Sequence, residues 1–201
     1  MADDGGREVW IKAGLVQLGQ GGVDSVRVEV VAAGLGVTKG GFYRRFRDRQ
    51  EFLEALLAAW SAGRIGAIEK QTTLDGAGVR DRLQSLVRLY SERHNAEAMG
   101  IELAVRQWAR ADPVAAGAAA KVDKARLENV ARLYGALGLP AAEAHAQAFL
   151  FYAFLFGQSL LFVDQGGKKR ADLLAACTTT LTAIEGAGSA AASSTRRRRG
   201  V

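Results

Sequence analysis

The residues best suited to bind a polyanion lie in the segment GVTKGGFYRRFRDR, residues 36–49. Its charged side chains are Lys39, Arg44, Arg45, Arg47 and Arg49 against Asp48, a local balance of +4. The whole chain carries +6 and the RRRR run at 196–199 contributes another +4, so the remainder is −2. Because the basicity is local, it indicates one surface that faces a polyanion such as DNA.

Two adjacent glycines in this segment need a reason, because each weakens a helix by about 1 kcal/mol relative to alanine. Helical spacing places Phe42 and Phe46 on one inward face. The outward face then holds Gly40, Gly41, Tyr43 and Arg44. A backbone without side chains can approach DNA closely while the phenol and guanidinium reach out beside it. We expect this contact to offset the helix cost of the glycines.

Apolar residues at helical spacing predict an all-α chain in which short helices precede long ones. The predicted helices cover residues 7–20, 28–35, 39–46, a stretch from 49 onward, 79–93, 96–111, 114–137, 141–164 and 168–185. Gly36 is the expected stop of the second helix, and Thr38 and Asp48 are the expected N-caps of the third and fourth. The stretch TTLDGAG, residues 72–78, is the expected joint before a larger helical body.

Two short helices joined by a tight turn, the second one basic, form the pattern of a helix-turn-helix. In that arrangement the second helix enters the major groove. Thr38 lies at its start, where backbone N–H groups favour a phosphate. Lys39 and Arg44 reach phosphates or guanine edges, and Arg49 is placed to clamp a neighbouring phosphate. The alternative is a solvated basic helix face, which a charge run by itself usually indicates.

Residues 7–57 resemble the TetR family of bacterial transcriptional regulators, on the strength of VEVVAAGLGVTKGGFYRRF followed by RDRQEFL. The resemblance implies a dimer with a helix-turn-helix DNA-binding domain at residues 1–50 and a helical effector-binding and dimerisation domain at 51–186. Effector binding would then re-space the two DNA-reading heads. The expected function is a repressor released from a near-palindromic operator in double-stranded DNA by a small apolar or aromatic effector. The alternative is a helical small-molecule-binding protein without sequence-specific DNA function.

Three positions depart from the usual family pattern: Arg27, Gly41 and Arg45. The departures bear on the operator sequence rather than on DNA binding itself, and Arg45 stays among the expected DNA contacts. Arg27 is either a further phosphate contact or the partner of Glu29 or Asp24 in a salt bridge.

The C-terminal half offers an expected dimer interface and an expected effector pocket. Helices 141–164 and 168–185 are the candidates for a four-helix bundle between subunits. The expected pocket residues are Met99, Leu103, Gln107, Trp108 and Tyr152, although residues of these types at helical spacing are more often packing. Residues 144–163 lack Asp, Glu, Lys and Arg, but their polar side chains favour a buried helix over a membrane span.

The remaining residues point away from enzymes and metal sites. His94 and His145 are too few and too far apart for a metal site, and we expect no cofactor. No Ser/His/Asp set, phosphate-cradling glycine loop or carboxylate pair stands out, so we expect no enzyme. The lone Cys177 and the absence of a signal-peptide pattern fit a cytoplasmic protein, with Cys177 a packing residue. We expect residues 187–201 to form a disordered basic tail that adds at most weak, non-specific attraction to DNA.

Overall fold

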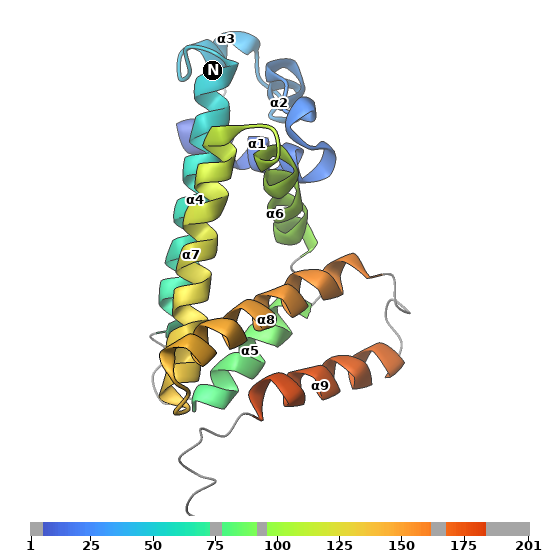
Figure 1. Cartoon of the computed structure of the whole chain (residues 1–201). Helices are drawn as coiled ribbons and strands as arrows, with labels where there is room; N and C mark the ends of the chain where they lie inside the picture. Colours follow the sequence, from blue (N-terminus) through green and yellow to red (C-terminus); the bar gives the residue numbers. More distant parts are fainter. Residues whose placement is uncertain (1–5, 73–77, 92–95, 162–167, 184–201) are drawn as a thin grey trace, which may run out of the picture. The chain divides into compact units, whose positions relative to one another are not determined.

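The computed structural model describes residues 6–72, 78–91, 96–161 and 168–183, and these ranges contain helices and turns only (Figure 1). Their elements are α1 (Arg7–Gly21), the 3-10 turn η1 (Val23–Ser25), α2 (Val28–Gly34), α3 (Lys39–Tyr43), α4 (Arg49–Thr72), α5 (Val79–Ser91), α6 (Ala96–Ala109), α7 (Pro113–Ala136), α8 (Ala141–Leu160) and α9 (Lys168–Thr182). The predicted all-α fold, with short helices before long ones, is confirmed.

The chain forms two compact units, residues 1–67 with 93–124 and residues 68–92 with 125–201. The first unit contains α1, α2, α3 and α6, and the second contains α5, α8 and α9, while α4 and α7 contribute to both. The predicted boundary at residue 50 divides the chain by function, with DNA binding before it and effector binding and dimerisation after it, and this boundary stays a prediction. The predicted joint at 72–78 and the predicted tail at 187–201 fall largely or wholly outside the described residues.

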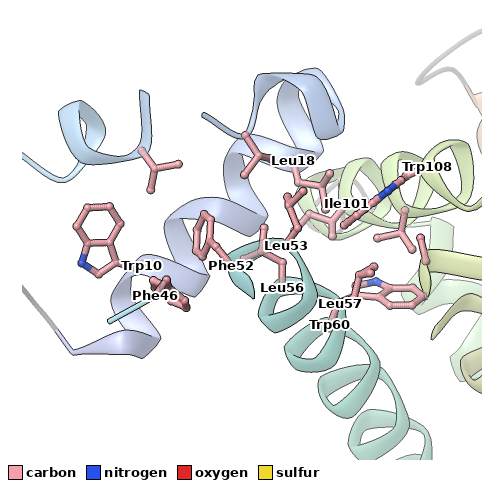
Figure 2. Close-up of a cluster of buried hydrophobic side chains, with 14 of the residues drawn as sticks. Trp10, Leu18, Phe46, Phe52, Leu53, Leu56, Leu57, Trp60, Ile101 and Trp108 are labelled. Carbon is pink, nitrogen blue, oxygen red and sulfur yellow. The ribbon is translucent and has the colours of Figure 1, made fainter. Parts of the chain in front are cut away.

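The core of the first unit is built around aromatic side chains of four helices. Trp10, Phe42, Phe46 and Phe52 are all at most 1% exposed, and Figure 2 shows Trp10, Phe46 and Phe52 grouped beside α1. Further along α4, Leu57 and Trp60 lie near Ile101 and Trp108 of α6 in the same view. Burial of each large side chain contributes about 1.5–3 kcal/mol, so this core fixes the short helices onto α4 and α6.

The second unit has its own core, formed by apolar faces of α5, the end of α7, and α8. Tyr134 is fully buried there, and its hydroxyl donates a 2.8 Å hydrogen bond to the carbonyl of Leu181. Burial raises the pKa of Tyr134 to about 12. Within the ranges that the structure describes, no helix is long and apolar enough to cross a membrane.

Candidate nucleic-acid interface

The turn between α2 and α3 is fixed by backbone hydrogen bonds. Gly36 adopts φ +67°, a left-handed conformation that favours glycine. Its N–H donates to the Ala33 carbonyl at 3.1 Å, and the Val37 N–H donates to the Ala32 carbonyl at 3.0 Å. These two bonds form a Schellman motif, which ends α2 and sets the direction of α3. The prediction that Gly36 stops the second helix is confirmed.

The inward face of α3 is anchored by the two phenylalanines that the sequence placed there. Phe42 and Phe46 stack with ring centroids 5.2 Å apart. Phe42 also meets the rings of Trp10 at 5.6 Å and Phe52 at 5.4 Å in edge-on geometry. Edge-on and offset pairs of this kind add about 0.5–1.5 kcal/mol each beyond their buried area. The anchoring holds α3 rigidly despite its short length.

The outward face of α3 presents a phenol and a guanidinium to solvent. Tyr43 is 60% exposed, and its ring leans edge-on against Phe42 at 5.2 Å, which limits its freedom. Arg44, at the C-terminal end of α3, is exposed, as is Gly40. Thr38 occupies the N-cap position as predicted and is exposed, but its side chain makes no capping hydrogen bond. This face combines donors and an aromatic ring on a fixed support.

Gly41 differs from the prediction. It is buried, so the expectation that both glycines lie bare on the outward face is wrong for Gly41 and correct for Gly40. At 100° per residue Gly41 lies on the flank of the helix, next to the inward face. The Arg45 guanidinium also folds back, and its Nη1 donates to the Gly41 carbonyl at 2.8 Å. Arg45 is therefore half-buried and engaged within α3.

Lys39 is exposed but already has an acidic partner. Its Nζ is 2.6 Å from Glu29 Oε1 of α2, and both side chains are more than half exposed. The hydrogen bond from Lys39 lowers the pKa of the Glu29 carboxyl, and Arg27 adds a smaller Coulombic effect. Arg27 is exposed, and Glu29 pairs with Lys39 rather than with Arg27. Because both side chains are exposed to solvent, this ion pair contributes little to stability, and a phosphate can compete for Lys39.

Arg49 holds the first helices together. Its Nε donates to the Val26 carbonyl at 2.8 Å, and its Nη2 donates to the Val23 carbonyl at 2.7 Å. These bonds tie the start of α4 to η1 and the entry of α2. Two of the five N–H donors of the guanidinium bind these carbonyls. The predicted contact of Arg49 with a DNA phosphate stays a prediction.

A charged cluster beneath α3 was not predicted from the sequence. Arg7 lies over the Phe46 ring at 4.2 Å and hydrogen-bonds the Arg45 carbonyl and Glu51 Oε1. Glu51 also accepts from the backbone N–H of Arg47 at 2.9 Å, while its own N–H donates to Asp48 Oδ1 at 2.8 Å. Hydrogen bonds from Arg47 and then Arg7 lower the pKa of Glu51 to about 2.

The one sequence signal for this cluster was the Asp48-x-x-Glu51 spacing. A carboxylate N-cap followed three residues later by glutamate is typical of a capping box. Asp48 does cap α4, as predicted, while Glu51 reaches the N–H one residue before the cap. The distant partner Arg7 carries no local signature in the sequence.

The predicted effector residues do not form one cluster within either unit. Met99 and Leu103 of α6 are half-buried, Gln107 is exposed, and Trp108 is 8% exposed in the core of the first unit. Tyr152 is 5% exposed and belongs to the core of the second unit. Trp108 and Tyr152 therefore act as packing residues, and an effector contact by any of the five stays a prediction.

The sequence also singled out His94, His145 and Cys177. His145 is exposed, with Nδ1 2.8 Å from the Ala141 carbonyl, and His94 lies outside the described residues. The part of the chain that the structure describes contains no group of three His, Cys, Asp or Glu side chains suited to a metal ion. Cys177 is half-buried, and its packing role stays a prediction.

Comparison with known proteins agrees with this geometry. Residues 11–56 match the family model described as bacterial regulatory proteins, tetR family. A search of curated proteins found no match. The family-model match covers α1 from residue 11 onward, η1, α2, α3 and the start of α4.

Solved structures share the fold of nearly the whole chain. A Rhodococcus protein described as a TetR-family transcriptional regulator is 22% identical with a TM-score of 0.68, and the match covers 88% of this chain and 98% of that one. E. coli NemR in its reduced form is 16% identical with a TM-score of 0.71, covering 88% and 97%. A Saccharomonospora viridis transcriptional regulator in complex with choline is 16% identical with a TM-score of 0.66, covering 87% and 92%. The resemblance to the TetR family is confirmed. The prediction of an N-terminal helix-turn-helix domain followed by a larger helical domain is confirmed as well.

Proposed function

Because residues 11–56 are a tetR-family domain in a TetR-like fold, we propose that this chain is a dimeric DNA-binding transcriptional repressor. A small apolar or aromatic effector releases it from a near-palindromic operator. The function is non-enzymatic and cytoplasmic. In this proposal residues 1–50 read DNA, and residues 51–186 bind the effector and the second subunit.

The observation that carries the proposal is the exposed pair on α3. Tyr43 is 60% exposed while the neighbouring Phe42 is fully buried, so α3 presents a fixed outward surface. An anchored helix that carries an aromatic ring and an arginine suits a major groove, where side chains read base edges and grip phosphates. Gly40 leaves space for close approach of the duplex at the start of this surface.

Dimerisation is supported by apolar side chains exposed on α8, directly after its end, and on α9. The exposed fractions are 64% for Phe149, 53% for Leu150, 57% for Leu160, 60% for Leu161 and 50% for Leu173. Exposed apolar surface concentrated on neighbouring elements often marks a protein interface. A two-fold dimer through α8 and α9 presents two α3 helices to two half-sites, which explains why a near-palindromic operator is expected.

The effector proposal is supported by the choline complex of the S. viridis regulator, which shows that one protein of this fold binds a small molecule. An effector alters DNA affinity only if it binds the two spacings of the DNA-reading heads differently. Met99, Leu103 and Gln107 of α6 are the predicted contacts that retain exposed surface.

The test is a mobility-shift titration with DNA from the region upstream of the protein's own gene. Tyr43→Ala and Arg44→Ala should weaken binding about tenfold or more, since a good base or phosphate contact contributes about 1–3 kcal/mol. The control is Arg110→Ala, which removes an exposed arginine remote in sequence from α3. Circular dichroism and gel filtration show that each variant is folded and has the same assembly state. Unchanged affinity in both α3 variants would contradict the proposal.

One observation favours the alternative, a helical small-molecule-binding protein without sequence-specific DNA function. Two of the predicted phosphate contacts already have partners inside the protein, Lys39 with Glu29 and Arg49 with the carbonyls of Val23 and Val26. If these contacts persist in the presence of DNA, fewer cations remain for phosphates. The alternative predicts equal affinity for upstream and random DNA together with tight ligand binding.

A further inference from the structure

A groove of about 470 Å³ lies in the first unit, where α1, α4 and α6 meet. Its lining residues are Leu15, Ala59, Trp60, Gly63, Arg64, Glu97, Ala98 and Ile101. The larger apolar side chains come from all three helices, and Figure 2 shows Trp60 and Ile101 on the neighbouring helices α4 and α6. Its volume is within the range of small-molecule sites. Its lining combines apolar side chains with the charged side chains of Arg64 and Glu97.

Arg64 is held at this groove by fixed partners. Its Nη2 donates to the Ala98 carbonyl at 2.7 Å, and its Nε lies 3.5 Å from Glu102 Oε2. The Glu102 side chain is only 2% exposed and is held in turn by Arg106, whose Nε donates to Glu102 Oε1 at 3.0 Å. A guanidinium fixed in this way keeps further N–H donors for a ligand and loses little entropy when it binds one.

Glu97 supplies the opposite charge at the same groove. It is exposed in the first turn of α6. None of the ion pairs found among the described residues joins Glu97 to Arg64, so the groove presents a carboxylate and a guanidinium that do not neutralise each other. A ligand that is only an acid meets the repulsion of Glu97, and a ligand that is only a base leaves the remaining N–H donors of Arg64 without an acceptor.

We propose that this groove binds a small amphoteric molecule with an apolar side chain, such as an aromatic or branched α-amino acid. Its carboxylate pairs with Arg64, its ammonium pairs with Glu97, and its side chain covers Leu15, Trp60 and Ile101. The site is distinct from the predicted effector contacts Met99, Leu103, Gln107, Trp108 and Tyr152. Binding of the small molecule in this groove does not require that the chain binds DNA.

The position of the groove gives its occupant a direct contact with the DNA-binding segment. Leu15 lies one helical turn before Gly19 on α1, and Ile101 follows Gly100 on α6. A Cβ added at Gly100 would lie 3.1 Å from the Gly19 carbonyl oxygen, so the two helix backbones nearly touch here. An occupant beside this contact braces α1 against α4 and α6.

The test is calorimetric titration of the full chain with L-phenylalanine and L-leucine. The single-charge probes are 3-phenylpropionate and 2-phenylethylamine, which each lack one charge of phenylalanine. We expect an amino acid to bind, and each missing charge to weaken binding about two- to fivefold, the range of exposed ion pairs. Glu97→Gln should abolish the preference for phenylalanine over phenylpropionate.

Two matched variants of α4 locate the binding. A Cβ at Gly63 or at Gly66 meets nothing within 4 Å, so a side chain can start at either position without a clash at Cβ. Gly63 lines the groove and Gly66 does not. Gly63→Leu should fill the groove and abolish binding, while Gly66→Leu should leave it unchanged. The proposal is overturned if neither amino acid binds, if Gly63→Leu binds as the wild type does, or if both single-charge probes bind as tightly as phenylalanine.

Discussion

The substitution Gly19→Ala places one methyl group where α1 and α6 approach most closely. Gly19 lies in the last turns of α1, and a Cβ there would be 2.9 Å from Ile101 Cγ1 and 3.0 Å from the Ile101 backbone nitrogen. The side-chain contact can yield by a rotation, but the backbone contact cannot. Either α1 or α6 must move to accommodate the methyl group.

Two effects of opposite sign decide the stability of this variant. Alanine is the better helix former, and replacing an unhindered helical glycine stabilises a protein by about 0.5–1 kcal/mol. Overpacking a close contact costs about 1–3 kcal/mol. Gly117 of α7, in the same unit, has nothing within 4 Å of an added Cβ, so Gly117→Ala gains the first effect without the second. The difference between the two variants is therefore the overpacking cost.

Urea unfolding followed by far-ultraviolet circular dichroism measures this difference. Gly117→Ala should be about 0.5–1 kcal/mol more stable than the wild type, and Gly19→Ala should be about 1–3 kcal/mol less stable than Gly117→Ala. Equal stabilisation by both substitutions would refute the close contact between α1 and α6.

Three further predictions concern polar contacts. The pKa of Glu51 is lowered to about 2, so the Glu51 carboxylate contributes its full stabilisation of the fold above pH 4.5 and loses it as the pH falls through about 2. In urea unfolding at a series of pH values, the stability advantage of the wild type over Glu51→Gln should therefore shrink between pH 4.5 and pH 2. Arg49→Met removes two hydrogen bonds to carbonyls and should lower the free energy of unfolding by about 1–3 kcal/mol. Arg27→Met should lower it by less than 0.5 kcal/mol, roughly the limit for plain surface changes. Equal losses of stability would show that Arg49 does not tie the start of α4 to η1 and α2. Tyr134→Phe should cost about 1 kcal/mol in the same assay, and it should remove the phenol that ionises only near pH 12 in an ultraviolet titration of the wild type.

Helix positions were predictable because local signals set them. Apolar periodicity predicted the positions of the long helices, and Gly36 and Asp48 lie at the helix ends where the sequence predicted a stop and a cap. The third helix is shorter than predicted, ending at Tyr43 rather than near Phe46. The Phe46 N–H still bonds to the Phe42 carbonyl at 3.0 Å, which keeps both rings on one side as the helical spacing required.

The roles of the cations were harder to predict because their partners are distant in sequence. Arg49 contacts carbonyls 23 and 26 residues away, and Arg7 contacts Glu51 across 44 residues. A basic run therefore looks the same in sequence whether an arginine faces DNA or its own backbone. Gly41 shows the same limit for burial, since a residue on the flank of a helix is covered or bare according to what the rest of the fold packs beside it.

The most direct measurement compares the affinity of the full chain for an upstream DNA fragment with its affinity for a random fragment of equal length, at one salt concentration. We expect a preference for the upstream fragment of about a thousandfold or more, the range of sequence-specific binding, and a sharp decline of this ratio in Tyr43→Ala. Equal affinity for the two fragments in the wild type would contradict it.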